Sequence, residues 1–121
     1  MRSNNKQVLA STARTATSAT DVPIPAHAVG LHIIIDVTAI AATPSVVPTI
    51  QFFDAISQKA YTVLTGAAIT GTGTTVLKIG PDIASVTNIA LQDYVPEMIR
   101  VTMTHADTDS ITYSVATKIF G

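Results

Sequence analysis

The stretch LHIIIDVTAI, residues 31–40, alternates between two kinds of side chain. Successive side chains of an extended strand point to opposite faces. One face therefore carries Leu31, Ile33, Ile35, Val37 and Ala39, and the other carries His32, Ile34, Asp36, Thr38 and Ile40. Because the first face is wholly apolar and the second is mixed, we predict a strand with one side on a hydrophobic core.

The same period of two continues along the chain. It recurs in residues 60–66 (AYTVLTG), 74–80 (TTVLKIG), 98–104 (MIRVTMT) and 111–120 (ITYSVATKIF). Short strands separated by turn residues every ~8–12 positions are typical of antiparallel sandwiches and barrels, and no stretch has the length of a crossover helix. We therefore predict an all-β fold, an antiparallel jelly-roll-like β-sandwich of about 7–8 strands.

Three segments leave alternatives open. Residues 44–54 carry Pro48, which cannot donate to a ladder, so this strand is either an edge strand or a bulged one. Residues 60–66 and 74–80, on either side of Gly71 and Gly73, form a hairpin or a pair that crosses between sheets. Residues 81–96 lack clear alternation and have a proline at each end, which permits a short helix or a packed loop.

The polar run HADTDS, residues 105–110, separates the last two strands, which we expect to pair as a hairpin. His105, Asp107, Asp109 and Ser110 bring together residue types found in catalytic sites, but Asp and Ser are also favoured in turns. An exposed turn offers neither the ordered triad nor the oxyanion hole of a hydrolase. The DTDS spacing lacks the glycine and distal glutamate of a calcium loop. We predict a structural corner and no enzyme activity.

Other features argue against cofactors and metals. His27 and His32 have apolar neighbours and no clustered partners, so we expect structural histidines. The chain has no cysteine, which removes disulfides and thiolate ligands, and TGTGTT (70–75) lacks the lysine of a phosphate loop. Phe52 and Phe53 must point to opposite faces, so one ring is expected to be exposed, in an oligomer interface or against a sugar.

Composition indicates one domain with a surface poor in charge. The 121 residues are 47% hydrophobic and only 12% charged, about half of the ~25% that is usual for a soluble domain. Either hydroxyl groups keep the surface solvated, or other subunits cover it. The most apolar stretch is too short to span a membrane, and the N-terminus lacks the apolar region of a signal peptide.

The first twenty residues differ from the rest. They hold three basic residues and no acidic one, whereas residues 21–121 hold four basic and eight acidic residues. Val8 and Leu9 are their only sizeable apolar groups apart from Met1, so this segment cannot fold alone. We predict an extended N-terminal arm, residues 1–20, that orders against something else, and a single β-sandwich domain, residues 21–121. Scattered basic residues without interleaved aromatics give no basis for nucleic-acid binding.

Two pieces of the chain carry a resemblance to a known family. Thr72–Leu77 (TGTTVL) and His105–Val115 (HADTDSITYSV) are its most specific parts, within a match over roughly residues 30–119. The chain resembles small virion structural proteins of tailed bacteriophages. It departs from their pattern at Met98 and Ile99, where an aromatic residue is usual, and in the stretch IQFFDAISQKAY.

The resemblance implies a capsid decoration or cement protein on the capsid exterior, made in the host cytoplasm, that binds the major capsid protein and stabilises the lattice. We expect a homo-oligomer, with a trimer favoured. The charge split suggests that the arm orders on the shell, with Val8 and Leu9 as anchors and Arg2, Lys6 and Arg14 facing shell carboxylates. A tail or neck component and a carbohydrate-binding module on the particle surface are the alternatives.

Overall fold

The computed structural model describes residues 3–121, and this part of the chain consists of strands and connecting loops without a helix. The all-β prediction is confirmed. The strands are β1 (Ser3–Arg14), β2 (Ser18–Pro23), β3 (Gly30–Ile40), β4 (Val46–Asp54), β5 (Lys59–Thr65), β6 (Gly73–Gly80), β7 (Ala90–Gln92), β8 (Met98–His105) and β9 (Ile111–Phe120).

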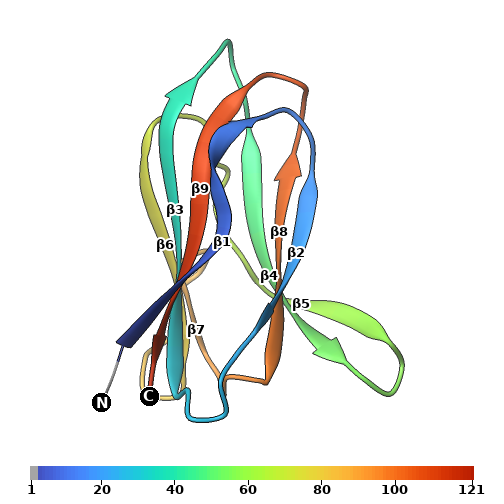
Figure 1. Cartoon of the computed structure of the whole chain (residues 1–121), viewed down its shortest axis with the longest axis vertical. Coiled ribbons are helices and arrows are strands. Elements are labelled where there is room, and N and C mark those ends of the chain that lie inside the picture. The colour runs from blue at the N-terminus through green and yellow to red at the C-terminus, as the bar shows by residue number, and fades with distance from the viewer. Residues whose placement is uncertain (1–2) are drawn as a thin grey trace.

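The strands form two sheets, which Figure 1 shows as two layers. The five-stranded sheet has the order β1-β9-β3-β6-β7, and the four-stranded sheet has the order β2-β8-β4-β5. Every pairing is antiparallel except that of β6 with β7. Without the short β7, the order is that of an eight-stranded jelly roll. The predicted jelly-roll-like sandwich is confirmed, with nine strands in place of 7–8.

The core lies between the sheets and is built from alternate residues of each strand. Ile33 and Ile35 of β3 are fully buried, as the alternation predicts, and they face buried side chains of β4 and β8 such as Ile50 and Ile99. Burying one such side chain stabilises the fold by roughly 1.5–3 kcal/mol. Ala39, expected on the same face, is exposed, because the register with β9 shifts between Val37 and Ala39 and breaks the alternation.

The predicted hairpin of the last two strands is wrong. β8 pairs with β2 and β4 in one sheet, whereas β9 pairs with β1 and β3 in the other. The HADTDS run therefore carries the chain across the sandwich. Each strand finds its partners elsewhere in the sequence, and local alternation carries no information on that choice.

The structure also decides between the alternatives for β4, β5 and β6. β4 lies inside its sheet, so it is no edge strand, and its pairing with β5 has a register shift between Ile50 and Gln51, as the bulge alternative predicts. The carbonyl of Pro48 accepts a hydrogen bond from Gly66 N (2.8 Å) beyond the end of β5. β5 and β6 lie in different sheets and are the sheet-crossing pair. Residues 81–96 are a packed loop around β7.

The N-terminal segment is part of the sandwich. Residues 3–14 form β1, which pairs with β9 along its whole length, from Ser3 opposite Phe120 to Arg14 opposite Ile111. β2 then pairs with β8, so the expected boundary at residue 20 falls inside a strand. An edge strand leaves a row of backbone groups unpaired. Without β1, β9 would have such a row, and the backbone of β1 pairs with it although the sequence of β1 is polar. Two register shifts, on either side of Leu9, interrupt the pairing.

Candidate interaction surfaces

The HADTDS corner is held together by its own polar groups. One carboxylate oxygen of Asp109 accepts hydrogen bonds from the backbone N (3.2 Å) and hydroxyl (3.4 Å) of Thr43, and Asp107 accepts one from Asp109 N (3.0 Å). Ala106 N donates to Ser45 O (3.0 Å). Asp109 and Ala106 therefore tie the β8–β9 corner to the β3–β4 corner, and Asp107 holds the turn itself, which are structural tasks.

The side chain of His105 bonds to Tyr113 and not to these carboxylates. Its Nε2 lies 3.0 Å from the hydroxyl of Tyr113, whose side chain is fully buried, and the guanidinium carbon of Arg14 lies 5.3 Å from the centre of the Tyr113 ring. Partial burial lowers the pKa of His105, and Arg14 acts in the same direction, while Asp107 opposes them. The imidazole of His105, bonded to a buried phenol, joins two sheets, and no described serine lies within hydrogen-bonding distance of it.

His32 lies on the outer face of the five-stranded sheet. It is paired with Lys78 on β6 and with Lys118 on β9, and its ring contacts Phe120 edge-on at a centroid distance of 4.8 Å. Burial lowers the pKa of His32, and the two lysines add to that effect. Within residues 3–121 no three His, Asp or Glu side chains are grouped in a way that could hold a metal ion.

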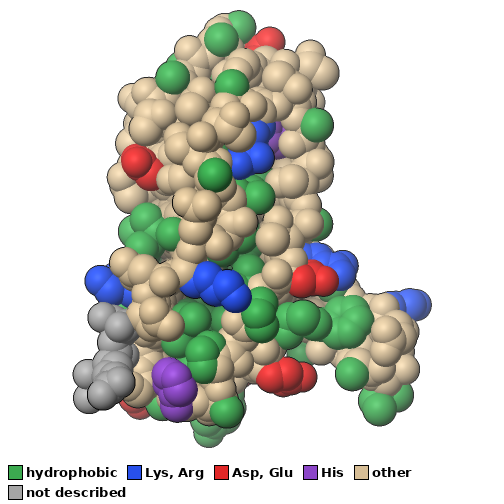
Figure 2. Space-filling model, viewed as in Figure 1, with side chains coloured by type: hydrophobic (Ala, Val, Ile, Leu, Met, Phe, Trp, Pro, Cys, Tyr) green, Lys and Arg blue, Asp and Glu red, His purple; other side chains and the backbone are tan. Residues whose placement is uncertain are grey.

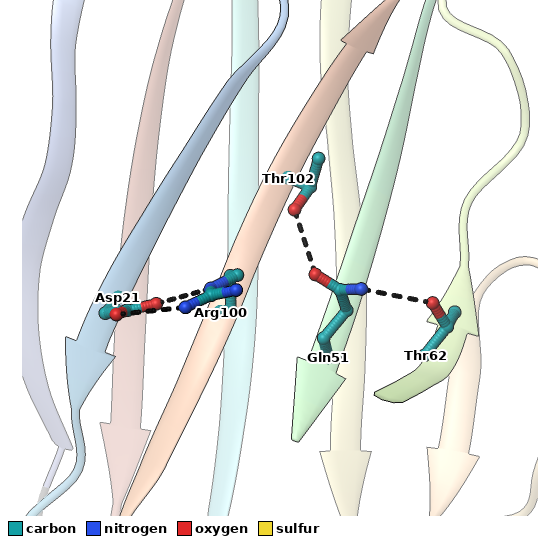
Figure 3. Close-up of polar contacts among 5 residues, drawn as sticks. All are labelled: Asp21, Gln51, Thr62, Arg100 and Thr102. Carbon is teal, nitrogen blue, oxygen red and sulfur yellow. Dashed lines mark hydrogen bonds and ion pairs between the residues drawn. The ribbon is translucent and has the colours of Figure 1, made fainter. Parts of the chain in front are cut away.

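A row of polar side chains crosses the outer face of the four-stranded sheet (Figure 3). Asp21 and Arg100 form an ion pair (2.7 Å), and Arg100 also lies over the ring of Phe53, 5.9 Å from its centre. In the same row, Gln51 accepts a hydrogen bond from Thr102 (3.1 Å) and donates one to Thr62 (3.4 Å). These residues face one another across β2, β8, β4 and β5. Their polar atoms stabilise the pairing of the strands.

The hairpin of β4 and β5 projects from the sandwich and ends in hydrophobic side chains (Figures 1 and 2). Ile56, at its tip, is 93% exposed, and Tyr61 is 53% exposed. Phe52 is buried and contacts Tyr61 edge-on, whereas Phe53, on the other face, is half-buried. The expectation that one of the two adjacent phenylalanines is exposed therefore holds only in part.

The residues predicted to bind a partner lie in different surroundings. Val8 and Leu9 are half-buried against the chain's own core. Arg14 lies over Tyr113. Lys6 is exposed in β1, and its carbonyl accepts a hydrogen bond from the buried Thr117 (3.3 Å). Arg2 lies outside the described residues.

The sequence did not predict the projecting β4–β5 hairpin as an interaction surface. Its turn residues, DAISQ (54–58), look like an ordinary polar loop, and only Ile56 in their midst indicates a contact point.

The described part of the chain holds no helix long and apolar enough to cross a membrane. Comparison of the chain with protein-family models, with curated proteins and with solved structures found no match.

Proposed function

We propose that the chain is a structural protein of the virion of a tailed bacteriophage, and that it decorates the capsid exterior as a homo-oligomer that stabilises the lattice of the major capsid protein. The proposal starts from the resemblance of Thr72–Leu77 and His105–Val115 to that family. A jelly-roll strand order is compatible with it but supports no function alone, since one fold serves many functions.

The observation that supports the proposal is the distribution of polar and apolar side chains over the surface. The polar residues that resembled a catalytic cluster are bonded to their own chain at the corner, as Asp109 is to Thr43. The most exposed large apolar side chain of the described residues, Ile56, lies instead in the turn between β4 and β5, at the end of the projecting hairpin (Figure 1). Projecting apolar groups on a chain with 12% charged residues suit burial against other subunits.

The basic N-terminal segment is the proposed contact with the shell. Val8 and Leu9 pack partly on the chain's own core, so they position β1 in the sheet. Lys6 is exposed on this strand and is available to a carboxylate of the shell. Surface pairs of this kind contribute about 0–1 kcal/mol each and are screened by salt. Binding to the lattice would then depend on many weakly held copies.

The test is co-sedimentation of the purified chain with empty expanded capsids and, separately, with tails of the phage that encodes it. Wild-type chain should sediment with capsids, and Lys6→Glu should bind more weakly while unfolding at the same temperature. Thr70→Glu, which adds a negative charge at an exposed position outside both β1 and the β4–β5 hairpin, is the control. Equal binding of Lys6→Glu and wild type would remove β1 from the proposed contact.

Sedimentation with tails alone would assign the chain to the tail or neck. The carbohydrate-binding alternative needs a shared platform of exposed rings. Phe53 and Tyr61 lie on opposite faces of the hairpin, since Phe53 is paired with Ala60, and Phe52 is paired with Tyr61. No observation on the described residues favours that alternative over assembly.

A further inference from the structure

Two glycines leave a hollow on the outer face of the five-stranded sheet. Gly30 begins β3 and Gly80 ends β6, and a Cβ added to Gly80 would lie 3.8 Å from the Cα of Gly30. Both lie on the face opposite the buried Leu31 and Ile79, which are paired with each other. The hollow is therefore turned away from the core of the sandwich.

Neither glycine is required by its backbone. Gly73 is the only described glycine with positive φ, and a Cβ at Gly30 or Gly80 would meet its neighbours no closer than 3.4 Å. Glycine within a strand costs roughly 0.5–1 kcal/mol relative to alanine. Strand glycines often mark a place where a ligand or another chain approaches closely. The missing side chains here create space for something outside the sheet.

The hollow is a pocket of about 150 Å³. Its walls are mainly apolar, and its rim carries charge; it is lined by Val29, Gly30, Leu31, His32, Lys78, Ile79, Gly80, Pro81, Asp82, Ile83 and Phe120. An apolar cavity of ~150 Å³ can hold a benzene molecule, so it can hold one aliphatic side chain. Lys118, paired with His32, adds a second lysine beside the rim.

The chain itself presents an aliphatic side chain of this kind. Ile56 is held on an ordered turn, because its backbone N donates to a carboxylate oxygen of Asp54 (3.1 Å) and the other oxygen accepts from the Ser57 hydroxyl (2.8 Å). Gln58 closes the turn with a bond to Ala55 O (2.6 Å). A preorganised turn loses little entropy on binding. The Ser57 hydroxyl lowers the pKa of Asp54, so the negative charge of Asp54 stays beside Ile56, whose side chain we call the knob.

We propose that Ile56 of one copy inserts into the Gly30–Gly80 pocket of a second copy, with Asp54 of the first copy near Lys78 of the second. The inference rests on the homo-oligomer of the proposed function and specifies its interface. The hairpin belongs to the four-stranded sheet and the pocket lies on the outer face of the other sheet, so a copy does not fill its own pocket. The fit of Ile56 to a mainly apolar pocket, with Asp54 beside Lys78 and Lys118, favours another copy as the occupant. Knob and pocket are different surfaces, so the contact is head to tail, and the homo-oligomer of the proposed function requires that it close into a ring.

The experiment is sedimentation equilibrium of the full chain without capsids. Ile56→Asp removes the knob, Gly80→Leu fills the pocket, and Lys78→Glu reverses the exposed charge at its rim without touching a glycine. Each should raise the dissociation constant for self-association at least about tenfold, as expected for a central interface residue. Ile40→Asp alters an exposed isoleucine at the opposite end of β3 and should associate as wild type does. Far-UV circular dichroism and a cooperative melt establish that each variant is folded.

A mixture of two variants tests the contact most directly. Ile56→Asp keeps an intact pocket and Gly80→Leu keeps an intact knob, so an equimolar mixture should form a dimer of one copy of each and nothing larger. If wild type is monomeric, or if folded Ile56→Asp and Lys78→Glu associate like wild type, the inference is overturned. A monomeric wild type that still sediments with capsids would overturn the interface and the homo-oligomer but leave the capsid-binding role, while a ring that binds no particle would remove the virion role alone.

Discussion

The Nε2 atom of His105, the last residue of β8, lies 3.0 Å from the hydroxyl oxygen of Tyr113 in β9. The two residues belong to different sheets, and the Tyr113 side chain is fully buried between them. Arg14 of β1 lies over the same ring. One phenol thus connects the corner residue of β8 to both strands at the edge of the five-stranded sheet.

Tyr113→Phe should lower the free energy of unfolding by about 0.5–1.5 kcal/mol, because it removes this hydrogen bond and keeps the ring. Urea denaturation checks the value. Tyr94→Phe removes the hydroxyl of a ring that is 80% exposed and should leave stability unchanged. Equal losses in the two variants would show that the bond to His105 contributes nothing.

Stability should fall as the pH drops below about 6.5. Burial lowers the pKa of both His105 and His32 from the usual 6.5. The unfolded chain therefore binds more protons than the folded chain between pH 6.5 and those lower values, and the folded state is fully favoured only above pH 6.5.

The pH dependence should be visible between about pH 6.5 and 5, because the lowered pKa values of Asp21 and Asp54 affect stability only around and below 3.8. Urea midpoints measured across this range check the sign. The double variant His105→Gln and His32→Gln should show a flatter profile. A midpoint that rises towards acid would contradict the assigned direction of the histidine pKa values.

Gly66→Ala should destabilise the fold by roughly 1–3 kcal/mol. A Cβ at Gly66 would lie 2.7 Å from Cγ of the Pro48 ring and 3.3 Å from its carbonyl oxygen, and a proline ring cannot rotate away. Gly71→Ala is the matched control, since nothing lies within 4 Å of its added Cβ and its φ is not positive. That change should be neutral or stabilise by about 0.4–1 kcal/mol. Thermal melts of both variants measure these two changes in stability.

Asp21→Asn should cost less than about 1 kcal/mol, although the ion pair with Arg100 is short at 2.7 Å. Both side chains are partly exposed, at 48% and 34%, so solvent screens the pair. The difference from wild type should shrink further in 1 M salt, where the Debye length is about 3 Å. A loss that is large and insensitive to salt would mean that the polar row on this sheet acts as one buried network.

Alternation predicted β3, β5, β6, β8 and β9, but not the partners of these strands. The pattern of β3 follows from Leu31, Ile33 and Ile35, which are buried as expected. The HADTDS run has the composition of a hairpin turn, yet it crosses between the sheets, because the bonds that fix it come from Thr43 and Ser45, more than sixty residues away. Such distant partners leave no trace in the local sequence.

The segments poor in apolar residues were the hardest to predict. β1 contributes little to the core, and its place is decided by the free edge of β9, a property of the assembled sheet. Likewise, Gly30 and Gly80 are fifty residues apart, and only the pairing of β3 with β6 brings them together as a pocket. The sequence shows an isoleucine at position 56, but it does not show that the β4–β5 hairpin projects from the sandwich.

The most direct test of the virion role is a saturation measurement with capsids. Purified chain is titrated onto empty expanded capsids and, in parallel, onto isolated tails, and the copies bound per particle are counted after sedimentation. A capsid decoration protein should bind capsids saturably at hundreds of copies, in a fixed ratio to the major capsid protein, with none on tails. Absence of binding to capsids, with or without binding to tails, would contradict that role.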